Sequence, residues 1–227
     1  MRIGVFGGTF DPIHYGHLRL AEEARESFGL ELVIFLPACV PPHKRKKRVA
    51  PAAHRLEMVR RAVAGNPAFQ VSDLECSRPG PSYSLESLCL LRERQGPEAE
   101  LFFLVGLDAF LFIHTWKAYR ELFAISNWIV LGRAGFGPSG KKALPAKMSN
   151  VFRYDPNERA WVHPSGHRVF FRGFRSLEIS GTEIRNLLEN GRSVKYLLPE
   201  EVADYINLHG LYGAKSESRP VERAHGS

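Results

Sequence analysis

Two kinds of apolar pattern alternate along the chain. Short, mostly apolar runs of strand length stand at residues 1–6, 32–36, 69–71, 101–105, 127–131 and 169–171. Apolar residues at helical spacing fill residues 15–28, 52–64, 85–91 and 199–209. Apolar strands that alternate with helices are typical of parallel strands buried on both faces. We therefore predict an α/β fold with a single doubly wound, Rossmann-like parallel sheet and a small helical portion at the C-terminal end.

Residues 133–166 depart from this pattern. The segment is rich in Gly, Pro, Lys and Arg, and it is far longer than the roughly 2 to 6 residues that ordinarily connect elements of an α/β fold. Such a segment is usually a lid or a surface excursion, and residues 151–154 and 161–163 within it could pair as a hairpin. We assign residues 1–212 to one domain that carries this insertion, and we expect the polar residues 213–227 to form a disordered tail.

The start and end of two helices are marked by local signals. Gly29 is expected to end the first helix. Ser180 with Glu183 forms a capping box at the start of a later helix, and Ile179 with Ile184 forms the hydrophobic staple around it. These signals predict helix boundaries without any tertiary information.

The composition is that of a soluble globular protein. Of 227 residues, 44% are hydrophobic and 24% are charged, which excludes a disordered or fibrous chain. The net charge of +7 suits polyanionic ligands such as nucleotides, and it would also suit nucleic acid. The 3 cysteines lack C-x-x-C spacing, which indicates a reduced, cytoplasmic chain without a zinc site. No apolar leader or long apolar run is present, so we expect neither export nor a membrane span.

A turn rich in glycine and histidine joins the first predicted strand to the first predicted helix, with the string GGTFDPIHYGH over residues 7–17. Gly7 and Gly8 allow a ligand to approach the main chain, and the following helix directs its N–H groups into the same space. His14 and His17 share roughly one helix face and can both donate to phosphate oxygens. Helix capping and metal binding are the alternatives, although no other His, Cys or Asp cluster stands nearby to complete a metal site. We assign to a phosphate site the residues Gly7, Gly8, Thr9, Phe10, His14 and His17.

This turn resembles the H-x-G-H motif of the nucleotidylyltransferase superfamily, and its full string resembles the bacterial nicotinate-nucleotide adenylyltransferase family. Residues 179–185 are similar to the second motif of the superfamily, Ile-Ser-Ser-Thr-x-Ile-Arg, in which the helix N-terminus and the arginine hold the ATP phosphates. The resemblance implies that Ser180, Thr182 and Arg185 bind these phosphates. Gly181 replaces the second serine, so a hydroxyl contact from that position is lost.

The same resemblance implies triphosphate contacts from the loop after the second predicted strand. His43 and Lys44 lie in a Pro-Pro-His-Lys string whose position carries phosphate-binding residues in the family. The basic run at residues 45–48 beside them is more typical of a solvated surface or a nucleic-acid patch.

Residues for the nucleoside and pyridine ends of the ligands are implied as well. Gly106 and Asp108 end a buried strand and suit close backbone approach and hydrogen bonds to ribose, although Asp108 could also cap a helix. Ser84 stands where the family has a threonine that contacts the pyridine carboxylate, and a helix cap fits this serine equally well. Thr115 and Trp116 match a pair that lies against the nicotinate ring, although a lone tryptophan is more often a core residue.

The resemblance implies adenylyl transfer from ATP to nicotinate mononucleotide, giving deamido-NAD and pyrophosphate in NAD biosynthesis. The attacking phosphate is largely ionised near neutral pH, because its second pKa is about 6, so no general base is required. Catalysis would rest on positioning and charge stabilisation by His14, His17, Lys44 and Arg185, with Mg²⁺ held mostly by substrate oxygens. We expect ATP and nicotinate mononucleotide as partners, and no nucleic acid. Two alternatives stay open, namely an adenylyltransferase for nicotinamide mononucleotide or phosphopantetheine, and a nucleic-acid-binding module.

Overall fold

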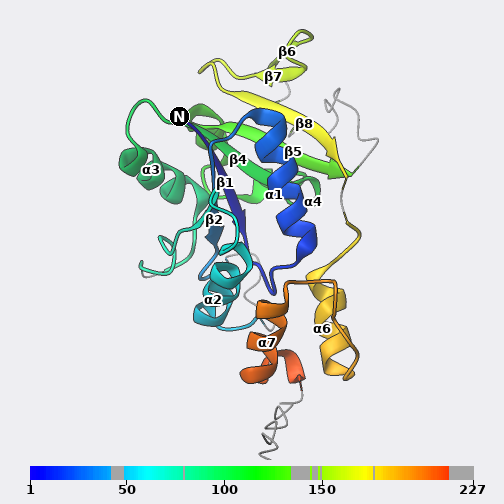
Figure 1. Ribbon diagram of the computed structural model, residues 1–227. Coiled ribbons are helices and arrows are strands. Elements are labelled where there is room, and N and C mark those ends of the chain that lie inside the picture. The colour runs from blue at the N-terminus through cyan, green and yellow to red at the C-terminus, as the bar shows by residue number, and fades with distance from the viewer. Residues whose placement is uncertain are drawn as a thin grey trace, which may run out of the picture.

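The computed structural model describes residues 1–41, 49–78, 80–133, 144, 148, 150–175 and 177–214. At its centre lies an eight-stranded sheet with helices on both faces (Figure 1). From edge to edge the strand order is β3, β2, β1, β4, β5, β8, β7, β6. The strands are β1 (Arg2–Gly8), β2 (Leu32–Pro37), β3 (Phe69–Val71), β4 (Glu100–Gly106), β5 (Asn127–Arg133), β6 (Arg153–Asp155), β7 (Ala160–Val162) and β8 (Arg168–Phe174).

The strands from β3 to β8 in this order are parallel. Ile3 in β1 lies opposite Leu32 in β2 on one side and Leu101 in β4 on the other. The chain fills the sheet from β1 through β2 to β3 on one side and from β4 to β5 and β8 on the other. Ligands of such sheets bind at the carboxyl ends of the strands where the order reverses, which here is the edge beside β1 and β4.

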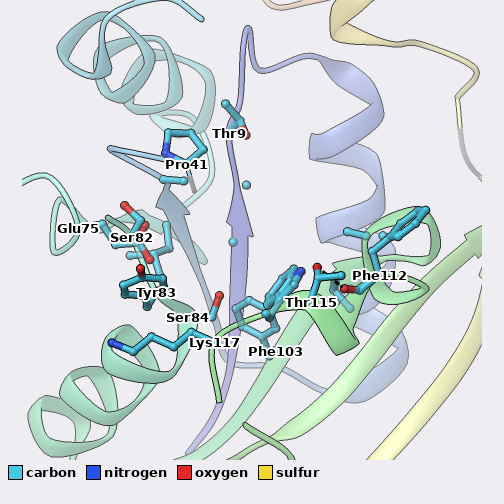
Figure 2. Close-up of a pocket in the computed structure, with 18 residues that line it drawn as sticks. Thr9, Pro41, Glu75, Ser82, Tyr83, Ser84, Phe103, Phe112, Thr115 and Lys117 are labelled. Carbon is cyan, nitrogen blue, oxygen red and sulfur yellow. Dashed lines mark hydrogen bonds between the residues drawn. The ribbon is translucent and has the colours of Figure 1, made fainter. Parts of the chain in front are cut away.

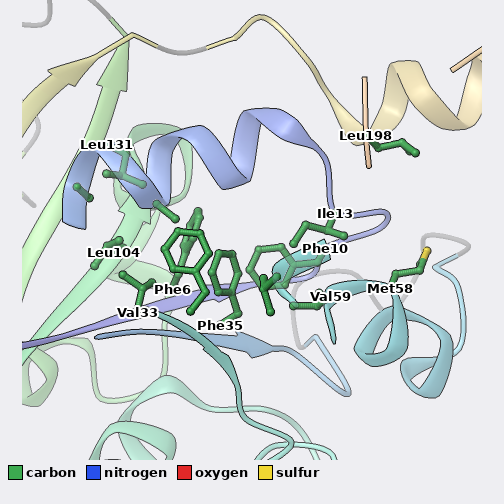
Figure 3. Close-up of a cluster of buried hydrophobic side chains, with 14 of the residues drawn as sticks. Phe6, Phe10, Ile13, Val33, Phe35, Met58, Val59, Leu104, Leu131 and Leu198 are labelled. Carbon is green, nitrogen blue, oxygen red and sulfur yellow. The ribbon is translucent and has the colours of Figure 1, made fainter. Parts of the chain in front are cut away.

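Successive side chains of the parallel strands contribute to two separate hydrophobic clusters. Phe102 and Leu104 point to one face, whereas Phe103 and Val105 point to the other. Figure 3 shows part of the first cluster, in which Phe35 of β2 packs near α2. Because both faces are apolar and covered by helices, the predicted doubly wound architecture is confirmed.

Helices from different parts of the chain cover the two faces. The first face is covered by α1 (Tyr15–Phe28) and α2 (Ala52–Val63), and α6 (Gly181–Glu189) and α7 (Glu200–Leu208) extend the same cluster beyond the strand ends (Figure 1). The second face is covered by α3 (Ser84–Gln95), α4 (Leu107–Phe110), the 3₁₀ turn η2 (Ile113–Thr115) and α5 (Tyr119–Ile125). A second 3₁₀ turn, η4 (Leu211–Gly213), follows α7. None of the helices in the described ranges is long and apolar enough to cross a membrane.

The predicted hairpin within the insertion is confirmed. β6 and β7 are antiparallel, with Tyr154 opposite Trp161, and β7 pairs antiparallel with β8. The insertion therefore extends the sheet beyond its parallel part. The remainder of the predicted excursion lies mostly outside the described residues.

The local helix signals also agree with the structure. Gly29 ends α1 in the left-handed conformation, with a φ of 58°. Ser180 is the N-cap of α6, and its Oγ accepts the Glu183 N–H at 3.1 Å. These ends are set by residues adjacent in sequence, so local chemistry is sufficient to predict them.

Candidate active site

A cavity of about 860 Å³ opens at the carboxyl ends of β1, β2 and β4, where the strand order reverses (Figure 2). Its wall also includes the start of α3 and the segment from α4 to Lys117. The predicted site residues that line it are Gly7, Gly8, Thr9, Ser84, Gly106, Thr115 and Trp116. The residues predicted for the pyridine ring therefore share one cavity with the glycine turn and with Gly106, which is predicted for the ATP site.

The other predicted residues that the structure describes lie outside this lining. His43 and Lys44 lie outside the described residues, so their predicted roles stay predictions. Asp108 is exposed, and the N-cap of α4 is Gly106, so the alternative role of Asp108 as a helix cap is wrong. The other predicted residues outside the cavity lining come from the two phosphate motifs and are Phe10, His14, His17, Ser180, Thr182 and Arg185.

Both glycines of the turn make room for aromatic rings as well as lining the cavity. A Cβ on Gly8 would lie 2.8 Å from the ring of Phe10, and a Cβ on Gly7 would lie 3.0 Å from the ring of Phe103. Phe10 itself is buried in the core, where its ring packs edge-on against Phe6. The rings of Phe10 and Phe103 therefore pack against the two glycines from opposite faces of the sheet.

The two histidines of the turn form a stacked pair. Their ring centroids are 3.7 Å apart with 28° between the planes, and the His17 ring packs edge-on against Phe10. His14 is only 5% exposed, and its Nδ1 has no hydrogen-bond partner among the described residues. Burial lowers the pKa of His14 to about 4, so the imidazole is neutral at pH 7. Buried polar atoms are normally hydrogen-bonded, but this nitrogen instead packs against Gly16, where a Cβ would lie 3.0 Å from it.

The two alternatives for these histidines can now be assessed. His14 occupies the N-cap position of α1, but its side chain makes no capping hydrogen bond in the described structure. Across the described ranges, no three side chains of His, Cys, Asp or Glu are grouped so that they could hold a metal ion. Anion binding remains the function that best fits the pair.

The second motif packs directly against the first. The Nη1 of Arg185 donates to the main-chain oxygen of Asp11 at 2.6 Å, and its Nη2 donates to Thr182 Oγ1 at 3.1 Å. A Cβ on Gly181 would lie only 2.9 Å from the same Asp11 oxygen. Glycine at the position of the motif's second serine thus allows the start of α6 to approach the turn.

The Asp11 carboxylate contacts two more segments as well as Arg185, a role that the sequence analysis missed. Its Oδ1 accepts the Tyr212 hydroxyl at 2.7 Å and the Ala50 N–H at 3.1 Å, and its Oδ2 lies 3.6 Å from Arg185 Nη1. Burial, together with the Asp11 charge, raises the pKa of Tyr212. Asp11 stands within the motif string, but no local signal indicates Tyr212 as its partner.

Arg55 is a second residue that the sequence analysis missed, because it lies in a helix assigned to the scaffold. Its side chain is 2% exposed and donates to the main-chain oxygens of Thr9 (2.8 Å), Ala38 (2.6 Å), Cys39 (2.9 Å) and Ala50 (2.9 Å). These oxygens belong to the turn after β1 and to both ends of the loop after β2. Arg55 therefore fixes the two loops relative to each other where they border the cavity.

The start of α3 and the segment around Trp116 form the opposite side of the cavity. The N-cap of α3 is Tyr83, and no side chain in the described structure caps it, so the alternative role of Ser84 as a helix cap is wrong. Ser84 is instead the first helical residue. The half-buried Trp116 packs edge-on against Phe103, with centroids 6.3 Å apart, and Thr115 Oγ1 donates to Phe112 O at 2.8 Å. The indole is thus held in place beside the cavity.

Glu75 adds a buried carboxyl group to the same wall. It is 6% exposed, and its Oε1 accepts the Ser87 hydroxyl at 2.7 Å. Burial raises the pKa of this carboxyl group. The sequence analysis did not identify Glu75, because nothing local distinguishes it from a surface glutamate.

Comparison with known proteins agrees with this geometry. The cytidylyltransferase-like family matches residues 5–187, so the fold and the site define a member of that nucleotidyltransferase family. Among solved structures, nicotinic acid mononucleotide adenylyltransferase of Plasmodium falciparum in complex with NaAD has a TM-score of 0.70 at 19% identity, over 93% of this chain and 97% of that chain. At that identity the likeness establishes the shared fold.

Curated relatives narrow the assignment. A protein of Pelobacter propionicus described as a probable nicotinate-nucleotide adenylyltransferase is 45% identical over 213 residues, which cover 93% of this chain and 98% of the relative. A protein of Citrifermentans bemidjiense with the same description is 46% identical over the same coverage. The chain belongs to the nicotinate-nucleotide adenylyltransferase family.

Proposed function

We propose that the protein transfers the adenylyl group of ATP to nicotinate mononucleotide, giving nicotinate adenine dinucleotide (deamido-NAD) and pyrophosphate. Membership of the family supports the reaction. The observation that carries the proposal for the site is the hydrogen bond from Arg185 to Asp11 O, which brings the second phosphate motif to the turn that holds His14 and His17.

The chemistry demands little acid–base catalysis. A phosphate oxygen of the mononucleotide attacks the α-phosphorus of ATP, and the bond from that phosphorus to the bridging oxygen of pyrophosphate breaks. The nucleophile is already largely anionic at neutral pH, because the second pKa of a phosphate monoester is about 6. The protein therefore has to align the two phosphates and stabilise the charge that develops.

The histidine pair is proposed to hold the α- and β-phosphates, with His17 bound to the oxygens on which charge develops. In the free protein His14 is neutral, because burial holds its pKa near 4. A bound polyphosphate favours the protonated ring, so ligand binding would raise this pKa. The stacked arrangement of the two rings in the turn supports this role.

Residues from other segments complete the proposed ATP site. Arg185 would grip the leaving pyrophosphate, since its contacts to Asp11 and Thr182 use only part of a guanidinium with five N–H groups. His43 and Lys44 are proposed as triphosphate contacts on the family resemblance alone. The further proposed contacts to ATP are Gly7, Gly8, Thr9, Phe10, Gly106, Asp108, Ser180 and Thr182.

Mg²⁺ is proposed to arrive as part of the ATP substrate. The described residues hold no group of three metal-ligating side chains. These residues fit an Mg²⁺ ion that is held mainly by phosphate oxygens and water, which is how Mg²⁺ usually binds with nucleotides.

The pyridine ring is proposed to bind between Trp116 and the start of α3. Trp116 offers an aromatic face, and the first N–H groups of α3 near Ser84 lack a side-chain cap. A cytoplasmic location is also proposed, which the free thiols of Cys39, Cys76 and Cys89 support.

The test is pyrophosphate release from ATP and Mg²⁺ with nicotinate mononucleotide, nicotinamide mononucleotide or phosphopantetheine. We expect turnover to be strongest with nicotinate mononucleotide and to fall by about 100-fold or more in His17→Ala. His163→Ala is the matched control. His163 directly follows β7, contacts Ser165 and is not among the residues that line the cavity. Absence of turnover with all three acceptors would contradict the proposal and would favour a binding module.

A further inference from the structure

Lys117 lies in the cavity wall, directly after Trp116, and neither the sequence motifs nor the proposed mechanism uses it. Figure 2 shows its side chain running from the Thr115 side of the cavity toward α3, below Tyr83 and Ser84. The Lys117 side chain is 56% exposed. Here the amino group is directed along the wall where the pyridine end of the mononucleotide is proposed to bind.

Two contacts hold the amino group of Lys117 in this position. Its Nζ donates to Glu86 Oε1 at 2.9 Å and lies 4.2 Å from the centre of the Tyr83 ring. Tyr83 and Ser84 line the cavity, and Glu86 is in the first turn of α3. Hydrogen bonding to Glu86 raises the pKa of Lys117, so the amino group is charged at neutral pH.

Glu86, which holds Lys117, also contacts a second cation. Glu86 is shared between two cations, because Arg78 Nη1 lies 3.6 Å from its Oε2 while Lys117 occupies Oε1. Lys117 and Arg78 thus share one carboxylate. Glu75 on the same wall is a further carboxyl group, and burial raises its pKa. An anionic substituent beside the Lys117 ammonium would be favoured over a neutral one of the same shape.

We propose that Lys117 is a specificity-determining residue, through which the protein prefers the carboxylate of nicotinate mononucleotide to the carboxamide of nicotinamide mononucleotide. The inference rests on the proposed adenylyl transfer. The two acceptors differ at one substituent on the ring, so an ammonium group held beside that substituent can distinguish them by charge. Glu86 opposes this preference, because it competes with the substrate for Lys117.

The test is the ratio of kcat/KM for the acid nucleotide to kcat/KM for the amide nucleotide, at saturating ATP. Lys117→Met keeps the length of the side chain and removes its charge. We expect this ratio to fall about fivefold, the size expected for a partly exposed charge pair, through a higher KM for the acid alone. Lys117→Arg should keep the ratio within about twofold, and Glu86→Gln should raise it, since Lys117 then loses its competing partner.

Lys195→Met is the matched control, because Lys195 also lies over a tyrosine, Tyr196, but outside the cavity lining. Its ratio should equal that of the wild type. An unchanged ratio in Lys117→Met, or an equal loss with both acceptors, would overturn the role of Lys117. Failure of the proposed function would look different, because the wild-type protein itself would then turn over neither acceptor.

Discussion

His14 and Arg55 show what burial does to single polar residues around this site. Burial lowers the pKa of both side chains. His14 therefore loses its proton at neutral pH, whereas Arg55, whose ordinary pKa is 12.5, stays charged and is stabilised by four main-chain oxygens. His14 is thus neutral in the free protein, whereas Arg55 holds the loops that form the wall of the site.

The stability of the protein should depend on pH through His14. The unfolded chain binds a proton at this residue below the ordinary pKa of 6.5, whereas the folded chain does so only near 4. Its contribution is thus fully present above pH 6.5 and is lost as the pH falls from 6.5 to 4, by about 3 kcal/mol in total. Denaturant unfolding of wild type and His14→Gln at several pH values measures this. The same pH dependence in both proteins would contradict burial as the cause.

Arg55→Met should lower the free energy of unfolding by about 3 kcal/mol, because four buried carbonyl oxygens lose their donor. Arg61→Met is the matched control on the same helix, because Arg61 is exposed and pairs with Glu57, and it should cost less than about 1 kcal/mol. Denaturant unfolding at pH 7 compares the two. In the fraction that remains folded, the KM for ATP should rise in Arg55→Met alone, since the turn at Thr9 is no longer held. Equal effects of the two substitutions would show that Arg55 has no special role.

At the scale of elements, the start of α6 is the feature that turns two separate motifs into one site. The cap at Ser180 is local, but the position of α6 depends on Gly181, which passes close to the Asp11 main-chain oxygen. If α6 began further from the turn, Arg185 would not lie within hydrogen-bond distance of Asp11. The start of α6 and the turn after β1 therefore fit each other in shape, at Gly181, as well as in charge, at Arg185.

Gly181→Ala should separate the start of α6 from the turn. The added Cβ would lie 2.9 Å from a main-chain oxygen, so we expect a loss of about 1 to 3 kcal/mol in stability and a higher KM for ATP. Gly65→Ala is the control, because a Cβ there meets nothing within 4 Å. Thermal unfolding and steady-state kinetics on both variants measure the difference. A Gly181→Ala protein with wild-type KM for ATP would show that the approach of α6 to the turn is not needed.

Elements and motifs could be predicted from the sequence because their signals are short-range. The apolar runs of β1 and β2, the glycine that ends α1 and the cap of α6 each depend on residues within a few positions of one another. The role of Ser84 could not be decided in this way. A serine before an apolar stripe fits both the N-cap and the first helical position, and only the backbone at Tyr83 distinguishes them.

At the scale of the whole molecule, the site depends on contacts between distant parts of the chain. The hydrogen bond from Tyr212 to Asp11 joins residues that are 201 positions apart, and that from Arg185 to Asp11 spans 174 positions. No periodicity or spacing predicts such partners. The sequence could indicate that both motifs bind phosphate, but their union in one site follows only from the order of strands and the position of α6.

The most direct test of the account is a double-mutant cycle on kcat for adenylyl transfer, with His17→Asn and Arg185→Gln. If both motifs act on the same triphosphate, each single substitution should lower kcat by about 100-fold, and the double variant should lose much less than the product of the two effects. Effects that multiply independently, or full activity in either single variant, would contradict a single phosphate site built from both motifs.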